Sequence, residues 1–255
     1  MSILNNKQPV KIIAILTLLV AGVVLTVFMQ TKPDNKLLTL NADDYLAVKM
    51  EITPSQTSSD VVRTQRNARF DNWNWVRSSV REGVTVGVMQ NDWDVGLPAL
   101  PVDKSSAVVI GIVRTGKAFL SNDQTGVYSE FVIEVVDWLK ADGMISPEPK
   151  SITVLRPGGR VIYPSGQTVK YLLAGQEMPK LDDKYFFFLS KRNGEDVYSI
   201  LTAYKTKVGE VQPLDENANY KANGLKFKAY EGLSEGDLRN TIFTEMGRNT
   251  TLKPE

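Results

Sequence analysis

One segment in the middle of the chain, residues 125–138, constrains the fold most, because its side chains alternate with the period of a β-strand. Phe131, Ile133 and Val135 share one face, which is the face expected in a hydrophobic core. The other face carries a tyrosine, two glutamates and a tryptophan beside two valines, so it is mixed in character. The segment is therefore predicted to be a strand that crosses the middle of a β-rich domain.

Further strand-like segments follow one another from residue 106 onward, separated by short turns that contain Gly or Pro. About seven strands at this spacing favour an antiparallel fold over βαβ units. We predict a mainly β fold, first a small barrel that resembles the oligonucleotide/oligosaccharide-binding (OB) barrel and second a sandwich. The expected strands are residues 107–113, 125–138, 151–156, 161–163, 168–173, 185–189 and 198–204.

Four turns punctuate these strands. The segment RPGGR, residues 156–160, has Pro and Gly where a type II turn requires them, so it is predicted to be a tight reversal. Residues 121–126, 163–166 and 192–194 are predicted to close hairpins in the same way. The charged face of the central strand is expected to lie toward RPGGR.

The N-terminal region contains an uncharged apolar run of 18 residues, Ile12 to Met29. As a helix it would be roughly 27 Å long, close to a bilayer core of about 30 Å. A cleaved signal peptide and a buried soluble helix are the alternatives. The run is longer than the ~7–15 residues of a signal peptide, and no A-x-A-like cleavage site follows it. We predict a single-pass transmembrane anchor.

The orientation of this anchor follows from its short N-terminal tail. Lys7 and Lys11 precede the apolar run, which gives a small positive-inside bias. The tail contains no domain and is easily left in the cytoplasm while the rest of the chain is translocated. Residues after about position 31 are therefore expected to be extracytoplasmic, with the protein located at the cell membrane.

The region between the anchor and the strands changes character and is predicted to be a spacer. It contains possible helical turns at residues 43–50, a short helix that ends near Phe70, and a strand in which Val84, Val86 and Val88 alternate. The predicted organisation is residues 1–31 tail and anchor, 32–104 spacer, 105–215 β domain, and 216–255 C-terminal tail.

The C-terminal tail is predicted to contain one helix. Ser234 is placed to cap it, with Asp237 three residues later. Leu238, Ile242 and Met246 form an apolar stripe at helical spacing. The stripe is expected to dock on the β domain, and a face for a partner helix is the alternative.

The absence of two residue types limits the chemistry. The sequence has no Cys and no His, so it cannot build a thiolate nucleophile, a histidine base or the usual zinc site. Basic and acidic residues nearly balance, 30 against 29, which argues against nucleic acid as a partner. No cofactor is expected.

Two groups of residues are candidates for ligand binding. Trp73, Trp75 and Trp93 stand beside Asp and Asn and could form a platform for sugars or extended peptides. Packing over the β domain, or contact with lipid headgroups, is the alternative reading. Arg156 and Arg160 flank a Gly-Gly turn and could bind a phosphate or a carboxylate. Solvated arginines, or a pair with a glutamate of the central strand, are the alternatives.

Two further groups supply carboxylates. Oxygen atoms of Asn122, Asp123, Thr125 and Glu130 gather near one turn and could bind a hard cation, but ordinary hairpin chemistry is the favoured explanation. A hydrolase could use two acidic side chains as a catalytic pair. The acidic candidates are Glu130, Glu134, Asp92 and Asp94.

Several strings in the β region, AFLSNDQTGVYSEF at residues 118–131, RPGGRV at 156–161 and YPSG at 163–166, resemble a family of uncharacterised bacterial envelope proteins. Members of that family typically have an N-terminal signal or anchor. The resemblance covers roughly residues 106–215 and implies a bacterial envelope setting. It carries no catalytic residue.

Together these features lead to one expectation and one alternative. We expect a membrane-anchored extracytoplasmic module that binds a protein or polymer of the envelope, and an enzyme is the less favoured reading. The alternative is a carboxylate-dependent hydrolase acting on envelope carbohydrate or peptide, with the tryptophans as its substrate platform.

Overall fold

The computed structural model describes residues 47–49, 61–81, 84–89, 93, 96–142, 148–191, 196–215 and 226–251. The chain divides into two compact units, Met1–Asn41 and Ala42–Glu255, and every described residue belongs to the second. The predicted membrane helix, residues 12–29, lies outside the described residues. Among the residues that are described, no helix is long and apolar enough to cross a membrane.

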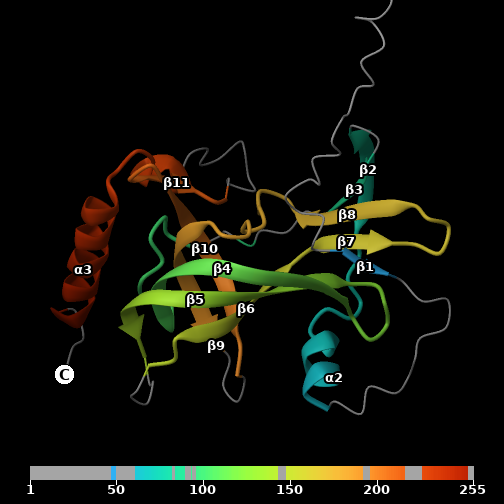
Figure 1. The fold of residues 1–255 in the computed structure, drawn as a ribbon, viewed down its shortest axis with the longest axis horizontal. Coiled ribbons are helices and arrows are strands. Elements are labelled where there is room, and N and C mark those ends of the chain that lie inside the picture. The colour runs from blue at the N-terminus through green and yellow to red at the C-terminus, as the bar shows by residue number, and fades with distance from the viewer. Residues whose placement is uncertain are drawn as a thin grey trace, which may run out of the picture. The chain divides into compact units, whose positions relative to one another are not determined.

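The described part is mainly β, as predicted, and it contains two sheets and a C-terminal helix (Figure 1). The first sheet has the order β1 (Ala47–Lys49), β7 (Gly159–Ile162), β8 (Thr168–Leu173), β3 (Val84–Met89) and β2 (Val76–Arg81). The second has the order β11 (Glu210–Pro213), β10 (Tyr198–Lys207), β6 (Ser151–Pro157), β5 (Val127–Ala141), β4 (Ala107–Leu120) and β9 (Lys184–Lys191). The helices are α2 (Val61–Ala68), the 3-10 turn η2 (Lys226–Tyr230) and α3 (Glu235–Thr251).

Five strands of the second sheet form a closed circuit of pairings. β4 pairs with β5, β5 with β6, β10 with β9 and β9 with β4, all antiparallel. β6 closes the circuit by pairing in parallel with β10. That parallel contact is short and joins Tyr198 to Val154 and Ser199 to Leu155.

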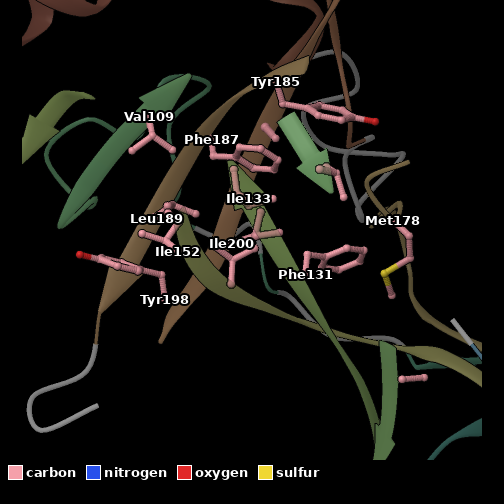
Figure 2. Close-up of a cluster of buried hydrophobic side chains, with 14 of the residues drawn as sticks. Val109, Phe131, Ile133, Ile152, Met178, Tyr185, Phe187, Leu189, Tyr198 and Ile200 are labelled. Atoms are coloured by element: carbon pink, nitrogen blue, oxygen red, sulfur yellow. The ribbon is translucent and has the colours of Figure 1, made fainter. Parts of the chain in front are cut away.

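The first core cluster contains one face of the central strand. Phe131 and Ile133 of β5 are fully buried there (Figure 2). Val135 packs against the cluster and remains partly exposed. Side chains from β6, β9 and β10 meet them, including Ile152, Phe187 and Ile200 (Figure 2). The face predicted from alternation is therefore the one that packs in the core.

The second core cluster explains why the sequences of β4 and β9 contain continuous apolar runs. In β9, Tyr185, Phe187 and Leu189 belong to the first cluster, whereas Phe186 and Phe188 belong to the second. β4 divides its side chains between the two clusters in the same way. Strands buried on both faces lose the polar positions of an alternating pattern.

The C-terminal helix α3 covers the second cluster. Ser234 caps it as predicted: its Oγ accepts a hydrogen bond from the Asp237 N–H at 3.1 Å. Leu238 and Ile242 are buried in the second cluster. Phe243 points away and is 44% exposed. The predicted stripe therefore docks on the β domain.

The region predicted as a spacer contributes three strands to the first sheet. β3 lies where Val84, Val86 and Val88 predicted a strand, and β1 and β2 were not anticipated. At residues 47–49 the predicted helical turns are wrong, since β1 pairs in parallel with β7 there. The rest of that predicted segment, residues 43–46 and 50, lies outside the described residues. Val48 packs against the first cluster, so tertiary pairing overrides a weak helical preference.

The segment RPGGR does not reverse the chain within one sheet, which corrects that prediction. β6 belongs to the second sheet and β7 to the first, so the segment carries the chain between sheets. Gly158 has a φ of 106°, and a Cβ there would lie 2.7 Å from the Tyr171 carbonyl oxygen. The turn at residues 163–166 closes a hairpin between β7 and β8, as predicted. Within it, the Gly166 N–H donates a hydrogen bond to the Tyr163 carbonyl at 2.8 Å. Residues 192–194 lie outside the described residues.

Candidate functional site

A pocket of about 270 Å³ lies over β6 and β10 where their pairing ends. Leu155 and Ser199 lie side by side on its floor. Their neighbours Val154 and Tyr198 belong to the first core cluster, so the floor is the opposite face of the sheet. We call this cavity the aromatic pocket, because three aromatic side chains line it: Phe70, Trp73 and Trp93.

Residues 69–73, which follow α2, supply three of the residues that line the pocket, Arg69, Phe70 and Trp73. The Phe70 ring stacks on Tyr128 of β5, with ring centroids 4.3 Å apart and planes 9° from parallel. Tyr128, Leu155 and Phe70 are buried together in a small cluster of their own. This stacking fixes the segment against the second sheet.

The hairpin turn between β4 and β5 also holds residues 69–73. The Asn72 N–H donates to the Asp123 carboxylate at 2.7 Å, and the Trp73 N–H donates to Thr125 Oγ1 at 3.1 Å. Gly126 makes the approach possible, because a Cβ at that position would overlap the Phe70 carbonyl oxygen. The turn therefore positions the pocket lining rather than a cation.

Asp123 is the centre of this turn. Its carboxylate accepts hydrogen bonds from Ser121 Oγ at 2.7 Å and from the Thr125 N–H at 3.0 Å, in addition to the Asn72 N–H. Partial burial raises the pKa of Asp123, but these hydrogen bonds outweigh it and hold the pKa below its usual range. The group is therefore ionised wherever the turn is formed at neutral pH. Within the described residues, no group of three or more acidic side chains is placed to hold a metal ion.

A pair of arginines ties α2 to the central strand. Arg63 and Arg66 both donate to the Glu130 carboxylate, and the Arg66 Nη1 to Glu130 Oε1 distance is 2.8 Å. The Tyr128 hydroxyl donates to Asn67 Oδ1 at 2.7 Å and accepts from Arg63 Nη1 at 3.1 Å. Burial raises the pKa of Tyr128 to about 12, so the hydroxyl keeps the proton that it donates.

The tryptophans of the pocket present carbon surface to it. Trp93 donates its indole N–H to the Ala174 carbonyl at 2.7 Å and stacks on Phe227, with the planes 2° from parallel. Trp73 donates its indole N–H to the Arg69 carbonyl at 3.3 Å. Both donors are thus occupied within the protein. Trp75 contacts Trp73 and packs against the first core cluster, and it is not among the residues that line the pocket.

Three polar side chains line the pocket. Arg69 donates from Nη2 to Ser199 Oγ at 2.9 Å, and it is the only charged side chain among the described residues of the lining. Gln176 is 6% exposed, and its buried Oε1 accepts no hydrogen bond from any described residue. A buried acceptor of this kind leaves one hydrogen bond for a bound water or a ligand to supply.

The predicted anion site at RPGGR is not formed. Arg156 is fully buried and pairs with Asp215, whose other oxygen accepts from Thr202 Oγ1 at 3.0 Å. Arg160 is buried on β7. Neither arginine lines the pocket or is solvated, so both are part of the protein interior.

The glutamates of the central strand do not lie toward RPGGR. Arg156 stands opposite Ser129 in the β5–β6 ladder, whereas Glu130 stands opposite Leu155 on the other face. Glu130 binds the arginines of α2, and Glu134 binds Arg114 at 2.7 Å. The remaining hydrolase candidates, Asp92 and Asp94, lie outside the described residues.

Comparisons of the chain with protein-family models, curated proteins and solved structures find no match. The aromatic pocket is therefore the feature of this chain from which a function can be inferred. Of the tryptophans singled out in the sequence, Trp73 and Trp93 line it. Arg69, Gln176 and Ser199 were not anticipated, because nothing in their local sequence marks them; only the folding of distant segments brings them together.

Proposed function

We propose that this protein is a membrane-anchored, extracytoplasmic binding module whose recognition site is the aromatic pocket. The observation that carries the proposal is the pocket itself, with three aromatic rings and the buried Gln176 acceptor around about 270 Å³ of space. Binding pockets are typically concave, mostly apolar, and supplied with a few convergent polar groups. The aromatic pocket has this composition.

The strand pairings support an OB-like barrel as the scaffold of the module. The circuit consists, in chain order, of β4, β5, β6, β9 and β10, and its short parallel contact joins the third of these strands, β6, to the fifth, β10. OB barrels are five-stranded, partly open Greek-key barrels that bind ligands on one face. In this protein α2 lies on the outer face of β5, and the pocket lies beside it over β6 and β10.

The cellular setting is proposed from the sequence. The uncharged run of residues 12–29 supports an anchor, and the resemblance to bacterial envelope proteins supports an extracytoplasmic location. A ligand held at the membrane surface would then be a component of the envelope.

A retention experiment tests the proposal. The full chain, solubilised in mild detergent, would be incubated with insoluble cell-wall polymer and, separately, with immobilised envelope proteins. We expect retention on one of these materials for the wild type and for Phe243→Ala, which removes an exposed ring outside the pocket. Trp93→Ala should lose retention at least tenfold, because it removes a wall of the pocket. Absence of retention of the wild type, or equal retention of all three chains, contradicts the proposal.

A further inference from the structure

We infer that the aromatic pocket takes a single sugar ring that bears a carboxylate, as found in acidic envelope glycans. This inference rests on the proposed binding function and names the ligand class for the same site. Four properties of the lining lead to it: its size, its carbon surface, its acceptor and its charge.

The size of the pocket limits the ligand to one ring. Its volume of about 270 Å³ is just below the ~300–1,000 Å³ of pockets that hold drug-sized ligands. Leu155 and Pro157 of β6 and Leu201 of β10 close the floor beneath it. A hexose ring is a group of this size, whereas an extended peptide of several residues is too long.

The aromatic walls suit the C–H face of a sugar. Both indole N–H groups are already bonded to backbone carbonyls, so Trp73 and Trp93 offer carbon surface rather than donors. Phe227 holds the Trp93 ring parallel to itself, which keeps that wall flat and fixed. Large flat apolar faces of this kind pack against the apolar face of a pyranose while its hydroxyls remain at the edge.

Gln176 supplies a partner for a sugar hydroxyl. Its Oε1 is buried in the lining and accepts no hydrogen bond from the described residues. A carboxylate ligand cannot satisfy this atom, because both groups are acceptors. A hydroxyl can donate to it, so the ligand needs a hydroxyl in addition to an anionic group.

Arg69 supplies the charge. It lines the pocket, and no carboxylate does so among the described residues. Its guanidinium is oriented by the Ser199 hydroxyl, which accepts one of its N–H groups. A guanidinium has several N–H donors and forms charge-assisted hydrogen bonds with a carboxylate. An acidic sugar places a ring, hydroxyls and a carboxylate in one compact group, which is what these four properties require.

Two sugars that differ only at one carbon test the inference. Glucuronic acid and glucose would each be titrated into the full chain in detergent, with binding followed by saturation-transfer NMR and by tryptophan fluorescence. We expect the wild type to bind glucuronic acid at least tenfold more tightly than glucose. Arg69→Gln should remove that difference. Arg114→Gln, which changes an exposed arginine outside the pocket, should preserve it.

Three results would overturn the ligand class. They are equal binding of both sugars by the wild type, failure of the wild type to bind either at the highest soluble concentration, and binding only of a short peptide with a free C-terminal carboxylate. In each case the Trp93→Ala retention experiment still reports on the proposed function, so the two failures are distinguishable. Thermal unfolding of Arg69→Gln at the wild-type temperature would show that the variant is folded.

Discussion

The buried pair of Arg156 and Asp215 shows how strongly a single residue can depend on its context. Arg156 stands in a turn-like sequence that suggests a solvated side chain, yet it is fully buried. Asp215 holds its guanidinium and also accepts hydrogen bonds from Thr202 and from the Glu177 N–H. A carboxylate with three partners fixes the end of β6, the middle of β10 and the segment before β9 relative to one another.

Removing one charge of this pair should be costly. Asp215→Asn leaves the Arg156 guanidinium buried without its counter-charge. We expect the free energy of unfolding to fall by about 3–5 kcal/mol, as is usual when a buried pair is broken. Urea unfolding followed by tryptophan fluorescence measures this change. Asp142→Asn removes an exposed carboxylate that pairs with Lys140, whose ammonium keeps its hydrogen bonds to two backbone carbonyls, and should change the same quantity by no more than about 1 kcal/mol. Equal effects of the two variants would contradict the prediction.

Asp123 gives the turn between β4 and β5 a pH dependence. Its pKa is lower in the folded chain than in the unfolded chain, where the usual value is 3.8. The stability that this carboxylate contributes is therefore present in full well above pH 3.8 and is lost as the pH falls through the folded pKa. Asp123→Asn should be less stable than the wild type at pH 7, and the difference should shrink below pH 4. Urea unfolding at pH 7 and at pH 3 measures it, and a difference that grows at pH 3 would show the opposite sign.

At the scale of elements, α2 is held by charge rather than by burial. None of its own residues is buried, and its attachment runs through Arg63, Arg66 and Asn67 to Glu130 and Tyr128 of β5. An isolated helix of eight residues is too short to be stable in water. The helix therefore exists because β5 supplies its partners, and the pocket lining that follows it depends on the same contacts.

Two glutamates on one face of β5 provide a matched test of this attachment. Glu130→Gln removes the charge shared by two arginines and should lower the free energy of unfolding by about 1.5–3 kcal/mol. It should also increase amide exchange in α2 and in residues 69–73. Glu134→Gln breaks only the exposed pair with Arg114 and should alter stability by at most about 1 kcal/mol, with no change in α2. Hydrogen exchange followed by mass spectrometry measures the amide exchange of α2 and of residues 69–73. Identical exchange profiles for the two variants would refute the prediction that Glu130 holds α2.

The elements that were predictable from sequence are those whose pattern is local. Alternation identified β5, and the spacing of Leu238 and Ile242 identified the docked face of α3. β1 was missed because it has three residues and is stabilised by pairing with β7, more than a hundred positions away. The prediction that RPGGR reverses the chain within one sheet was wrong, because a turn motif does not determine whether the two strands that it connects belong to the same sheet.

At the scale of the whole molecule, the site is an outcome of topology. Sequence reasoning selected Trp73 and Trp93 by residue type, and both line the pocket. Arg69, Gln176 and Ser199 reach the same cavity from three separate parts of the chain, because β10 pairs with β6 and the segment after α2 packs on β5. No local sequence pattern indicates that these three residues lie together. The charged group of the pocket, Arg69, and its buried acceptor, Gln176 Oε1, could therefore not have been predicted.

The proposed membrane anchor leads to a prediction about the location and orientation of the whole chain. Residues 12–29 have the length and apolarity of a single membrane span, with two lysines close before it. A reporter that is active only outside the cytoplasm, fused after Glu255, should therefore be active, and the full-length chain should leave membranes only in detergent. Leu19→Arg places a charge at the centre of the span, at a cost of about 2.5–3.5 kcal/mol, and should reduce insertion, whereas Leu19→Ile should not. A shortened chain released without detergent would instead identify a cleaved signal peptide, and an inactive reporter would reverse the orientation.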